Sequence, residues 1–391
     1  MSAAPDLVVI GGGIAGASIA YELAASRSVL LLEAEPTLAV HSTARSAATY
    51  IPGHGTAPVR ALITASGPRF AALAGALCDG GAAPLLTPRP VLWAAFDDAG
   101  ERALHGLLAE RAGEPDAPRP VSTAEALRRC PVLRPGALRG AGLTEVSADV
   151  DAMALHQAYV RGLRRRGATV RTGARVTAVR ATAGGWRVEV AGSTGVDGAA
   201  GAAAFEVADV VDAAGAWADV VATMAEVPPI GLTPLRRTIA VARVPDPARL
   251  RVGGGMPLPM VVEAGERFYF KAEGEHLLVS PGDETPAEPG DARPCDLDVA
   301  TALERAEAVT GLGLRSIRTS WAGLRSFVAD RSPVVGSRPE HPGFHFFAGQ
   351  GGSGIESAPA LAALGAAVIT GGPVPADIPV APAVLTPTRF A

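Results

Sequence analysis

A glycine-rich segment near the N-terminus constrains the fold of this chain more than any other feature. Gly11, Gly13 and Gly16 follow the apolar run 7–10 and precede residues 14–25, whose spacing is helical. Glycines at this spacing permit a sharp turn, a close approach of backbone amides to an anion, and tight packing of a helix on a strand. The segment predicts a strand–turn–helix unit that binds the pyrophosphate of a dinucleotide, with Ile14 and Ala15 at the helix start.

The residues that follow complete a βαβ unit. A second apolar run, 29–32, ends at Glu33 and Ala34. An acidic residue at this point is placed to accept hydrogen bonds from a ribose. The motif by itself does not distinguish NAD from FAD.

The loop after the second strand distinguishes the two cofactors. A nicotinamide dehydrogenase usually continues with regular βα units, whereas residues 40–48 are small and polar and are suited to lining a flavin and its phosphates. We therefore expect FAD. The contact residues expected in this loop are His41, Ser42, Thr43, Arg45, Ser46, Ala47 and Ala48.

Later segments predict that the nucleotide-binding parts are split along the chain. Amphipathic residues 153–166 predict a helix, and residues 297–309 predict another. The low-complexity stretch 191–204 predicts a mobile hairpin loop. Residues 320–370 predict two strands and a long apolar helix, and we expect the Pro-rich tail from Gly372 to be loosely ordered.

Composition excludes several classes of protein. Hydrophobic residues make up 48% of the 391 residues and charged residues 19%, which builds a packed core, and the net charge of -4 gives no footprint for nucleic acid. Three scattered cysteines, Cys78, Cys130 and Cys295, predict neither a zinc site nor disulfides, and we expect no metal. Without a basic leader or a long apolar run, a cytoplasmic protein is expected.

Several ordered motifs together resemble the D-amino acid oxidase-like superfamily of FAD enzymes, and most closely its D-arginine dehydrogenases. The motifs are 41–47, 55–62, 213–217, 321–330 and 350–355. The resemblance implies an α/β (α+β) fold, in which a Rossmann-like FAD-binding domain carries an inserted antiparallel-sheet substrate domain. The implied FAD-binding segments are 1–60, 140–226 and 312–391, and the implied substrate-binding segments are 61–139 and 227–311.

The resemblance also implies the remaining contacts of a non-covalently bound FAD. We expect the segment 350–355 to open the last long helix, with its free amides facing the flavin, where negative charge accumulates on reduction. The implied residues are Val176, Ala213, Ala214, Gly215, Trp217, Gly323, Arg325, Gln350, Gly351, Gly352, Ser353, Gly354 and Ile355.

An amino acid substrate needs its carboxylate held, and paired arginines do this well. The resemblance implies Arg325 and Arg237 for this role, with Arg236 as the alternative to Arg237. It also implies that Tyr269 faces the substrate, and that Gly352 and Ser353 lie beside it.

Three positions depart from the D-arginine dehydrogenase pattern. Thr49 replaces a histidine beside the substrate, His54 replaces a tyrosine on a lid loop, and Val91 replaces the acidic partner of the guanidinium. An unpaired buried cation would cost about 3 kcal/mol or more. We therefore expect D-arginine and D-lysine to be poor substrates and a neutral or apolar side chain to be preferred.

The implied reaction removes the Cα hydrogen as hydride to flavin N5. The resulting imino acid hydrolyses to a 2-oxo acid and ammonia. Related sarcosine oxidases use a lysine over the flavin to activate oxygen. Residues 276–280 contain none, which favours a dehydrogenase that passes electrons to a quinone or another carrier. An oxidase of secondary or N-methyl amines and a non-catalytic flavin-binding protein remain as alternatives.

Overall fold

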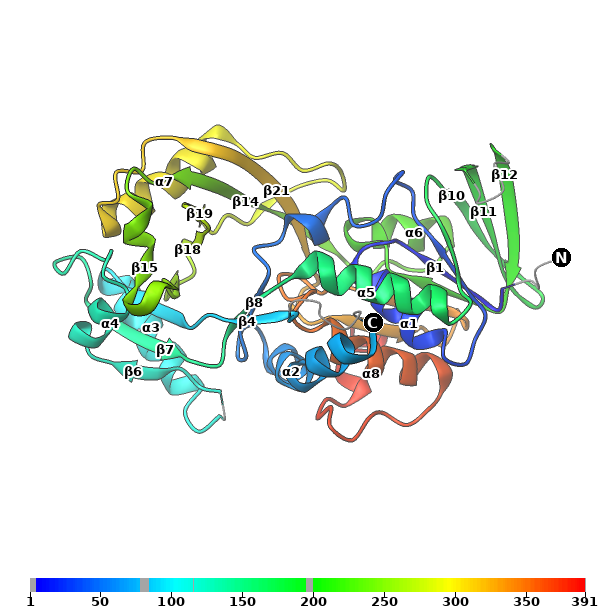
Figure 1. The fold of residues 1–391 in the computed structure, drawn as a ribbon. Helices are drawn as coiled ribbons and strands as arrows, with labels where there is room; N and C mark the ends of the chain where they lie inside the picture. The colour runs from blue at the N-terminus through cyan, green and yellow to red at the C-terminus, as the bar shows by residue number, and fades with distance from the viewer. Residues whose placement is uncertain (1–4, 78–83, 115, 195–199, 391) are drawn as a thin grey trace.

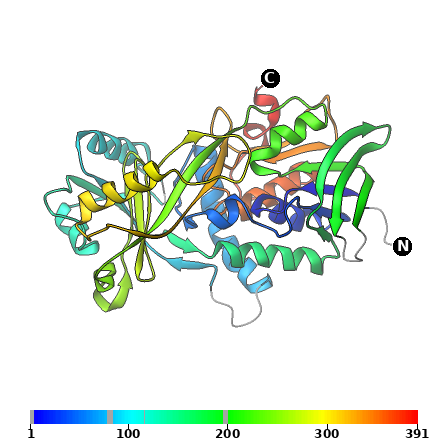
Figure 2. The same cartoon turned by 90° about the horizontal axis from the view of Figure 1, so that it is seen from above.

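The computed structural model of the chain describes residues 5–77, 84–114, 116–194 and 200–390. Two lobes lie side by side in it, as Figures 1 and 2 show. One lobe carries β1 and both chain ends, and the other carries α3, α4 and α7. The long strands β14 and β21 extend between them (Figure 1).

A mainly parallel sheet forms the centre of the first lobe. Its strands, in spatial order, are β22 (Val334–Ser337), β23 (Phe344–Ala348), β13 (Asp209–Asp212), β1 (Leu7–Ile10), β2 (Val29–Leu32) and β9 (Thr169–Arg171). Only β22 runs antiparallel to its neighbour in this order. Both β1 and β2 are buried at every position, as expected for parallel strands covered on both faces.

The two faces of this sheet are covered by different layers. Leu7 and Val9 face a core built with four helices, α1 (Ile14–Leu23), α2 (Ala57–Leu77), α5 (Ala152–Arg165) and α8 (Ala358–Thr370). Val8 and Ile10 face a second core. That core includes α6 (Ala218–Met224) and the antiparallel strands β10 (Arg175–Thr182), β11 (Gly185–Thr194) and β12 (Ala200–Val207).

The second lobe is built on a larger, mostly antiparallel sheet. Its strands are β20 (Thr285–Pro286), β14 (Thr233–Arg243), β19 (His276–Ser280), β18 (Tyr269–Glu273), β17 (Met260–Glu263), β5 (Val91–Ala95), β7 (Gly140–Thr144) and β6 (Arg119–Val121), and β21 (Ile317–Phe327) pairs with β14. The helices of this lobe are α3 (Asp98–Glu110), α4 (Thr123–Arg129) and α7 (Asp296–Thr310).

Short strands complete the fold. One small sheet contains β3 (Thr49–Tyr50), β8 (Ala148–Val150) and β4 (Leu86–Pro88), and another contains β15 (Arg251–Val252) and β16 (Met256–Pro257). In the described parts of the chain, no helix is both long and apolar enough to cross a membrane.

The predicted fold class is confirmed: a nucleotide-binding lobe and a second lobe with a mostly antiparallel sheet are both present. The predicted domain boundaries stay a prediction. Three elements lie close to the predicted boundaries. Helix α2 packs on α8 and α5 of the first lobe, whereas β7 and β21 belong to the sheet of the second lobe.

Two local predictions are wrong. The segment 350–355 does not open a helix, because it forms turns and α8 begins only at Ala358, where Ser357 is the N-cap. The tail after Gly372 is not loose, because Ile378, Val380 and Leu385 are buried in the core of the first lobe. The burial of apolar side chains spaced along the tail therefore holds it against the first lobe, despite its many prolines.

Other local predictions agree or fall partly outside the description. The helices predicted at 153–166 and 297–309 are α5 and α7. The stretch 191–204, predicted to be a mobile hairpin loop, lies partly in strands, because residues 191–194 belong to β11 and 200–204 to β12, and these strands pair as a hairpin. Residues 195–199 lie outside the described residues, as does Cys78.

Candidate active site

The glycine loop has the close contacts that its spacing predicts. Gly11 has a φ of +109°, and a Cβ there would lie 2.5 Å from the carbonyl oxygen of Ala213. A Cβ at Gly16 would lie 2.9 Å from the carbonyl carbon of Gly11 and closer still to its oxygen. The amide of Ile14 donates to Thr43 Oγ1 (3.0 Å). The N-cap Gly13 makes no side-chain hydrogen bond, so the next amides of the first turn are directed at the space before the helix.

One cavity of about 370 Å³ extends from this loop to the face of the larger sheet. Near the loop it is lined by Glu33, Ala34, Val176, Ala213, Ala214, Gly215 and Trp217, and towards the sheet by Thr49, His54, Arg237, Tyr269, Gly323, Arg325, Gly351 and Gly352. Residues far apart in the sequence therefore share one continuous space of the size that a ligand needs.

Polar groups near the glycine loop suit a dinucleotide. The Glu33 carboxylate accepts hydrogen bonds from the amides of Gly12 (2.7 Å) and Glu35 (2.8 Å), which fixes its orientation at the cavity wall. The His41 ring lies 4.8 Å from the Trp217 ring, and its buried Nδ1 has no partner within the described protein. A buried polar atom without a partner at a cavity wall is suited to a hydrogen bond from a bound group.

The loop 41–48 is fastened to β21, not left free. Ser42 Oγ donates to the carbonyl oxygen of Leu324 (2.6 Å). The guanidinium of Arg45 donates to the carbonyl oxygens of Ala292 (2.9 Å) and Ala322 (3.1 Å) and pairs with Asp291 (2.5 Å). Arg45 therefore lines the cavity while its charge holds the loop, and its predicted contact with the cofactor stays a prediction.

A buried lysine supports the same loop from outside the cavity. Lys271 Nζ donates to the carbonyl oxygen of Ala47 (2.7 Å) and to Asp149 (2.9 Å), and Arg89 binds the other oxygen of Asp149 (2.5 Å). His156 on α5 likewise contacts the carbonyl oxygen of Gly12 through Nε2 (2.9 Å). No sequence motif predicts these roles of Lys271 and His156, because their contacts join elements that are distant in sequence.

The strand register separates Arg237 from Arg236. Arg325 pairs with Leu235 across β14 and β21, so Arg325 and Arg237 are diagonal neighbours on one face of the sheet. Both line the cavity. Arg236 points to the other face, where its Nη2 binds Asp298 of α7 (2.7 Å). Burial, followed by the charge of Arg237, lowers the pKa of Arg325 to about 10.

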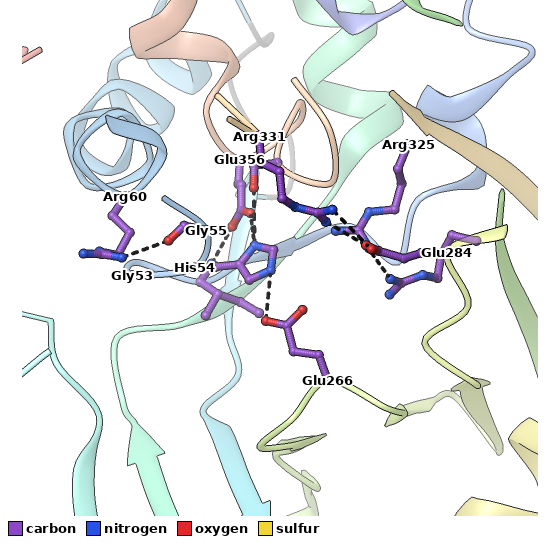
Figure 3. Close-up of polar contacts among 12 residues, drawn as sticks. Gly53, His54, Gly55, Arg60, Glu266, Glu284, Arg325, Arg331 and Glu356 are labelled. Carbon is purple, nitrogen blue, oxygen red and sulfur yellow. Dashed lines mark hydrogen bonds and ion pairs between the residues drawn. The ribbon is translucent and has the colours of Figure 1, made fainter. Parts of the chain in front are cut away.

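A carboxylate that the sequence did not indicate joins these arginines. Oε1 of Glu284 accepts from Arg237 Nη2 (3.4 Å), Arg325 Nη1 (3.3 Å) and Arg331 Nη2 (2.8 Å). Figure 3 shows Glu284 between the guanidinium groups. The loop that carries it is irregular in sequence, so no periodic signal pointed to it.

His54 lies between two further carboxylates, Glu266 and Glu356 (Figure 3). Its Nε2 is 3.6 Å from Glu266, and its Nδ1 is 3.4 Å from Glu356 and 3.3 Å from Ser353 Oγ. Burial lowers the pKa of His54, but the hydrogen bonds and charges of the two carboxylates outweigh it and raise the pKa to about 10. His54 is therefore a cation at neutral pH.

Neither acidic partner of His54 was predicted. Glu356 follows the 350–355 motif directly and is buried, and it also accepts from the amide of Ile51 (2.8 Å). Glu266 has a φ of +58°, in the turn between β17 and β18. Its contact with His54 lowers the pKa of Glu266 to about 2. The one signal in the sequence for Glu356 was its position directly after the glycine-rich motif 350–355.

Three predicted contact residues do not line the cavity: Gly16, Val91 and Ser353. Gly16 packs against Gly11, and Ser353 reaches the site only through His54. Val91 is fully buried in a cluster with Trp93 and Met260. The predicted contact between Val91 and a substrate side chain is therefore wrong in this structure, and Trp93 and Met260 line that part of the cavity instead.

Comparisons with solved structures place this geometry among known folds. Glycine oxidase from Geobacillus kaustophilus is 22% identical, with 98% of each chain covered and a TM-score of 0.83. Iminodiacetate oxidase from Chelativorans sp. BNC1 is 25% identical, with 97% of this chain and 98% of that chain covered and a TM-score of 0.74.

Sequence comparison also finds similarity to FAD-dependent oxidoreductases. A curated bovine protein, FAD-dependent oxidoreductase domain-containing protein 1, is 28% identical over 175 residues, which are 40% of this chain and 34% of that one. The match thus spans about a third of that relative's length. The profile of the DAO family, described as FAD dependent oxidoreductase, matches residues 6–368. The chain belongs to the DAO family of FAD-dependent oxidoreductases.

Proposed function

We propose that this FAD-dependent oxidoreductase oxidises the Cα–N bond of a small amino acid, most specifically a D-amino acid with a neutral or apolar side chain. The observation that carries the proposal is the pair Arg237 and Arg325, which face one cavity from neighbouring strands beside Tyr269. Two guanidinium groups and a phenol arranged in this way suit the carboxylate of an amino acid. The D configuration rests on the motif resemblance to D-arginine dehydrogenases.

The protein's part in this reaction is to bind and orient the substrate. FAD, when bound, supplies the acceptor for the hydride that leaves Cα. The arginines fix the carboxylate, and the walls of the cavity exclude water. Water later hydrolyses the imino acid to a 2-oxo acid and ammonia.

The side-chain preference follows from the wall beside the arginines. Ile51, Trp93, Met260 and Val262 line it with apolar surface. Glu266 is an acidic group in this wall, but protonated His54 and the charges of Arg325 and Arg237 together offset its charge. A cationic substrate side chain therefore finds no unpaired carboxylate, so the expected weak activity on D-arginine and D-lysine now rests on this balance and not on Val91.

His54 is suited to hold a lid closed. It lies between Gly53 (φ +97°) and Gly55 (φ +87°), which allow the loop to change direction. Its ion pair with Glu266 joins the loop to the turn after β17. Because His54 is already protonated at neutral pH, it does not take a proton from the substrate amine there. The amine must therefore reach the flavin in its neutral form.

Strand β19 carries no lysine at the position opposite Tyr269, which is Ser280. This supports a dehydrogenase that passes electrons to a quinone or another carrier. The similarity to an iminodiacetate oxidase favours one second candidate, an oxidase of a secondary or N-methyl amine that uses O₂.

Anaerobic reduction of the flavin tests the proposal. D- and L-amino acids with neutral, basic and acidic side chains, and their N-methyl forms, are mixed with the FAD-loaded protein, and loss of flavin absorbance is followed. We expect the fastest reduction with a neutral D-amino acid. The fastest rate on D-arginine would overturn the side-chain preference, and the fastest on an N-methyl amine would favour the second candidate. Hydrogen peroxide formed at the rate of turnover in air would show an oxidase.

A further inference from the structure

Glu284 forms a bridge at the arginine pair that the proposed function leaves unexplained. Its two carboxylate oxygens accept from Arg331 (2.8 and 3.2 Å), while Oε1 alone accepts from Arg237 and Arg325 at 3.4 and 3.3 Å. The short contacts are therefore with Arg331, and the longer ones are with Arg237 and Arg325, which together form the proposed substrate anchor. Glu284 thus connects the anchor to a third arginine, Arg331, which is not part of the cavity lining.

The position of Glu284 is fixed by its neighbours in the chain. Asp283 accepts from both the amide (2.7 Å) and the hydroxyl (2.9 Å) of Thr238, one residue beyond Arg237. The next residues form β20, which pairs with β14. Arg331 is held from the other side, because its guanidinium carbon lies 3.7 Å from the centre of the Phe327 ring. Both partners of the bridge are therefore oriented by strands β14 and β21.

The charges around the anchor leave room for one carboxylate. Four cations, Arg237, Arg325, Arg331 and protonated His54, face three carboxylates, Glu266, Glu284 and Glu356. Burial raises the pKa of Glu284, but the arginines outweigh it and lower the pKa, so Glu284 is ionised at neutral pH. The excess is a single positive charge. An amino acid with a neutral amine and one carboxylate cancels it.

We propose that Glu284 is a specificity-determining residue that restricts the anchor to substrates with one carboxylate. This inference rests on the proposed function, because it takes Arg237 and Arg325 as the substrate anchor. Glu284 and Arg331 are not in the lining of the cavity, but Glu284 contacts both arginines that are. A second acidic group that extended past Arg237 and Arg325 would meet the charge of Glu284, and Arg331 is already occupied by Glu284. Without the charge of Glu284, Arg331 becomes available to a second carboxylate.

The test compares Glu284→Gln with Glu288→Gln in the FAD-loaded protein. Glu288 is exposed on the same loop, so its substitution removes the same charge away from the arginines. Acetate and succinate serve as one- and two-carboxylate probes, and binding is measured from the change that they cause in the flavin absorbance spectrum. Neither probe needs to react, so the result is independent of whether an amino acid is oxidised.

We expect Glu284→Gln to tighten acetate binding several-fold and succinate binding by about a further tenfold, a difference of about 1.4 kcal/mol. That size lies between the water and near-surface values for unit charges a few ångströms apart. Glu288→Gln should leave both unchanged. The double variant Glu284→Gln/Arg331→Gln should lose the extra gain for succinate.

Three outcomes would overturn the inference. Equal gains for acetate and succinate would show a general charge effect. Weaker binding of both by a folded, FAD-loaded Glu284→Gln protein would show that Glu284 only positions the arginines. Equal effects of Glu288→Gln would show a long-range effect of net charge. Failure of the proposed function is distinct from all three, because it would appear as absent flavin reduction by amino acids whatever these binding results are.

Discussion

Gly352 offers a way to displace Arg325 without changing any charge. A Cβ at this position would lie 2.6 Å from both Cζ and Nε of Arg325, and nearer still to Nη2. The obstacle is the end of a flexible side chain, so Gly352→Ala should fold while the guanidinium retreats by about 1 Å. A hydrogen bond lengthened by about 1 Å from its usual ~2.9 Å is lost.

The size of the expected effect on KM follows from the hydrogen bonds that Arg325 would lose. A hydrogen bond to a charged group contributes about 1.5–3 kcal/mol, and each 1.4 kcal/mol is about tenfold in affinity. We therefore expect the KM of Gly352→Ala for its amino acid substrate to rise by about 10- to 100-fold, with acetate binding weakened to a similar degree. Steady-state kinetics at saturating electron acceptor measures the first, and the flavin spectrum measures the second.

A matched control separates this effect from the loss of a glycine as such. Gly106 is exposed on α3, and a Cβ added there would have no neighbouring atom within 4 Å, so Gly106→Ala should leave KM unchanged. An unchanged KM in a Gly352→Ala protein that retains its FAD would refute the assignment of Arg325 to the substrate carboxylate.

Three further predictions follow from the same geometry. Gly16→Ala should give a protein without FAD, since the methyl group would overlap the Gly11 carbonyl; a normal flavin content after purification would contradict this. The pKa of His54 is raised from 6.5 to about 10. The stabilisation of the fold by protonated His54 is therefore fully present below pH 6.5 and is lost as pH rises through 10. The melting temperature of the wild type should therefore exceed that of His54→Gln at pH 6.5 and approach it above pH 10, whereas a constant difference would exclude this ion pair as the cause. Lys271→Met removes the support of Ala47 and should weaken FAD binding by about tenfold, as measured by fluorescence titration, whereas Lys271→Arg should weaken it less; equal affinities for both variants and the wild type would disprove the role of this lysine.

The sequence was sufficient for the nucleotide-binding half because its signals are local. The spacing of Gly11, Gly13 and Gly16 encodes a turn, and the apolar runs beside it encode strands buried on both faces. The expectation of FAD drew on the loop 41–48 and on the motif resemblance. The glycine loop, the apolar runs and the loop 41–48 all lie within the first 48 residues, and each motif of the resemblance is a short run that can be read without its contacts.

The substrate end depended on contacts that no local pattern contains. Which of Arg236 and Arg237 faces the cavity is set by the pairing of β14 with β21. Glu284 meets Arg325 only because two strands from distant segments place them together. Val91 could be matched to a substrate-facing position by sequence, and it lies on the same face of β5 as the cavity-lining Trp93, but packing in the cluster with Trp93 and Met260 leaves its side chain fully buried.

The proposed function requires Arg237 and Arg325 to hold the substrate carboxylate while FAD oxidises the neighbouring Cα–N bond. Anaerobic mixing of the FAD-loaded protein with D-alanine or with D-alaninamide tests it most directly, because the two differ at the carboxylate. We expect D-alanine to bleach the flavin and D-alaninamide to do so at least about 100-fold more slowly, because two charge-assisted hydrogen bonds are lost. Equal rates of bleaching by the two compounds would contradict it.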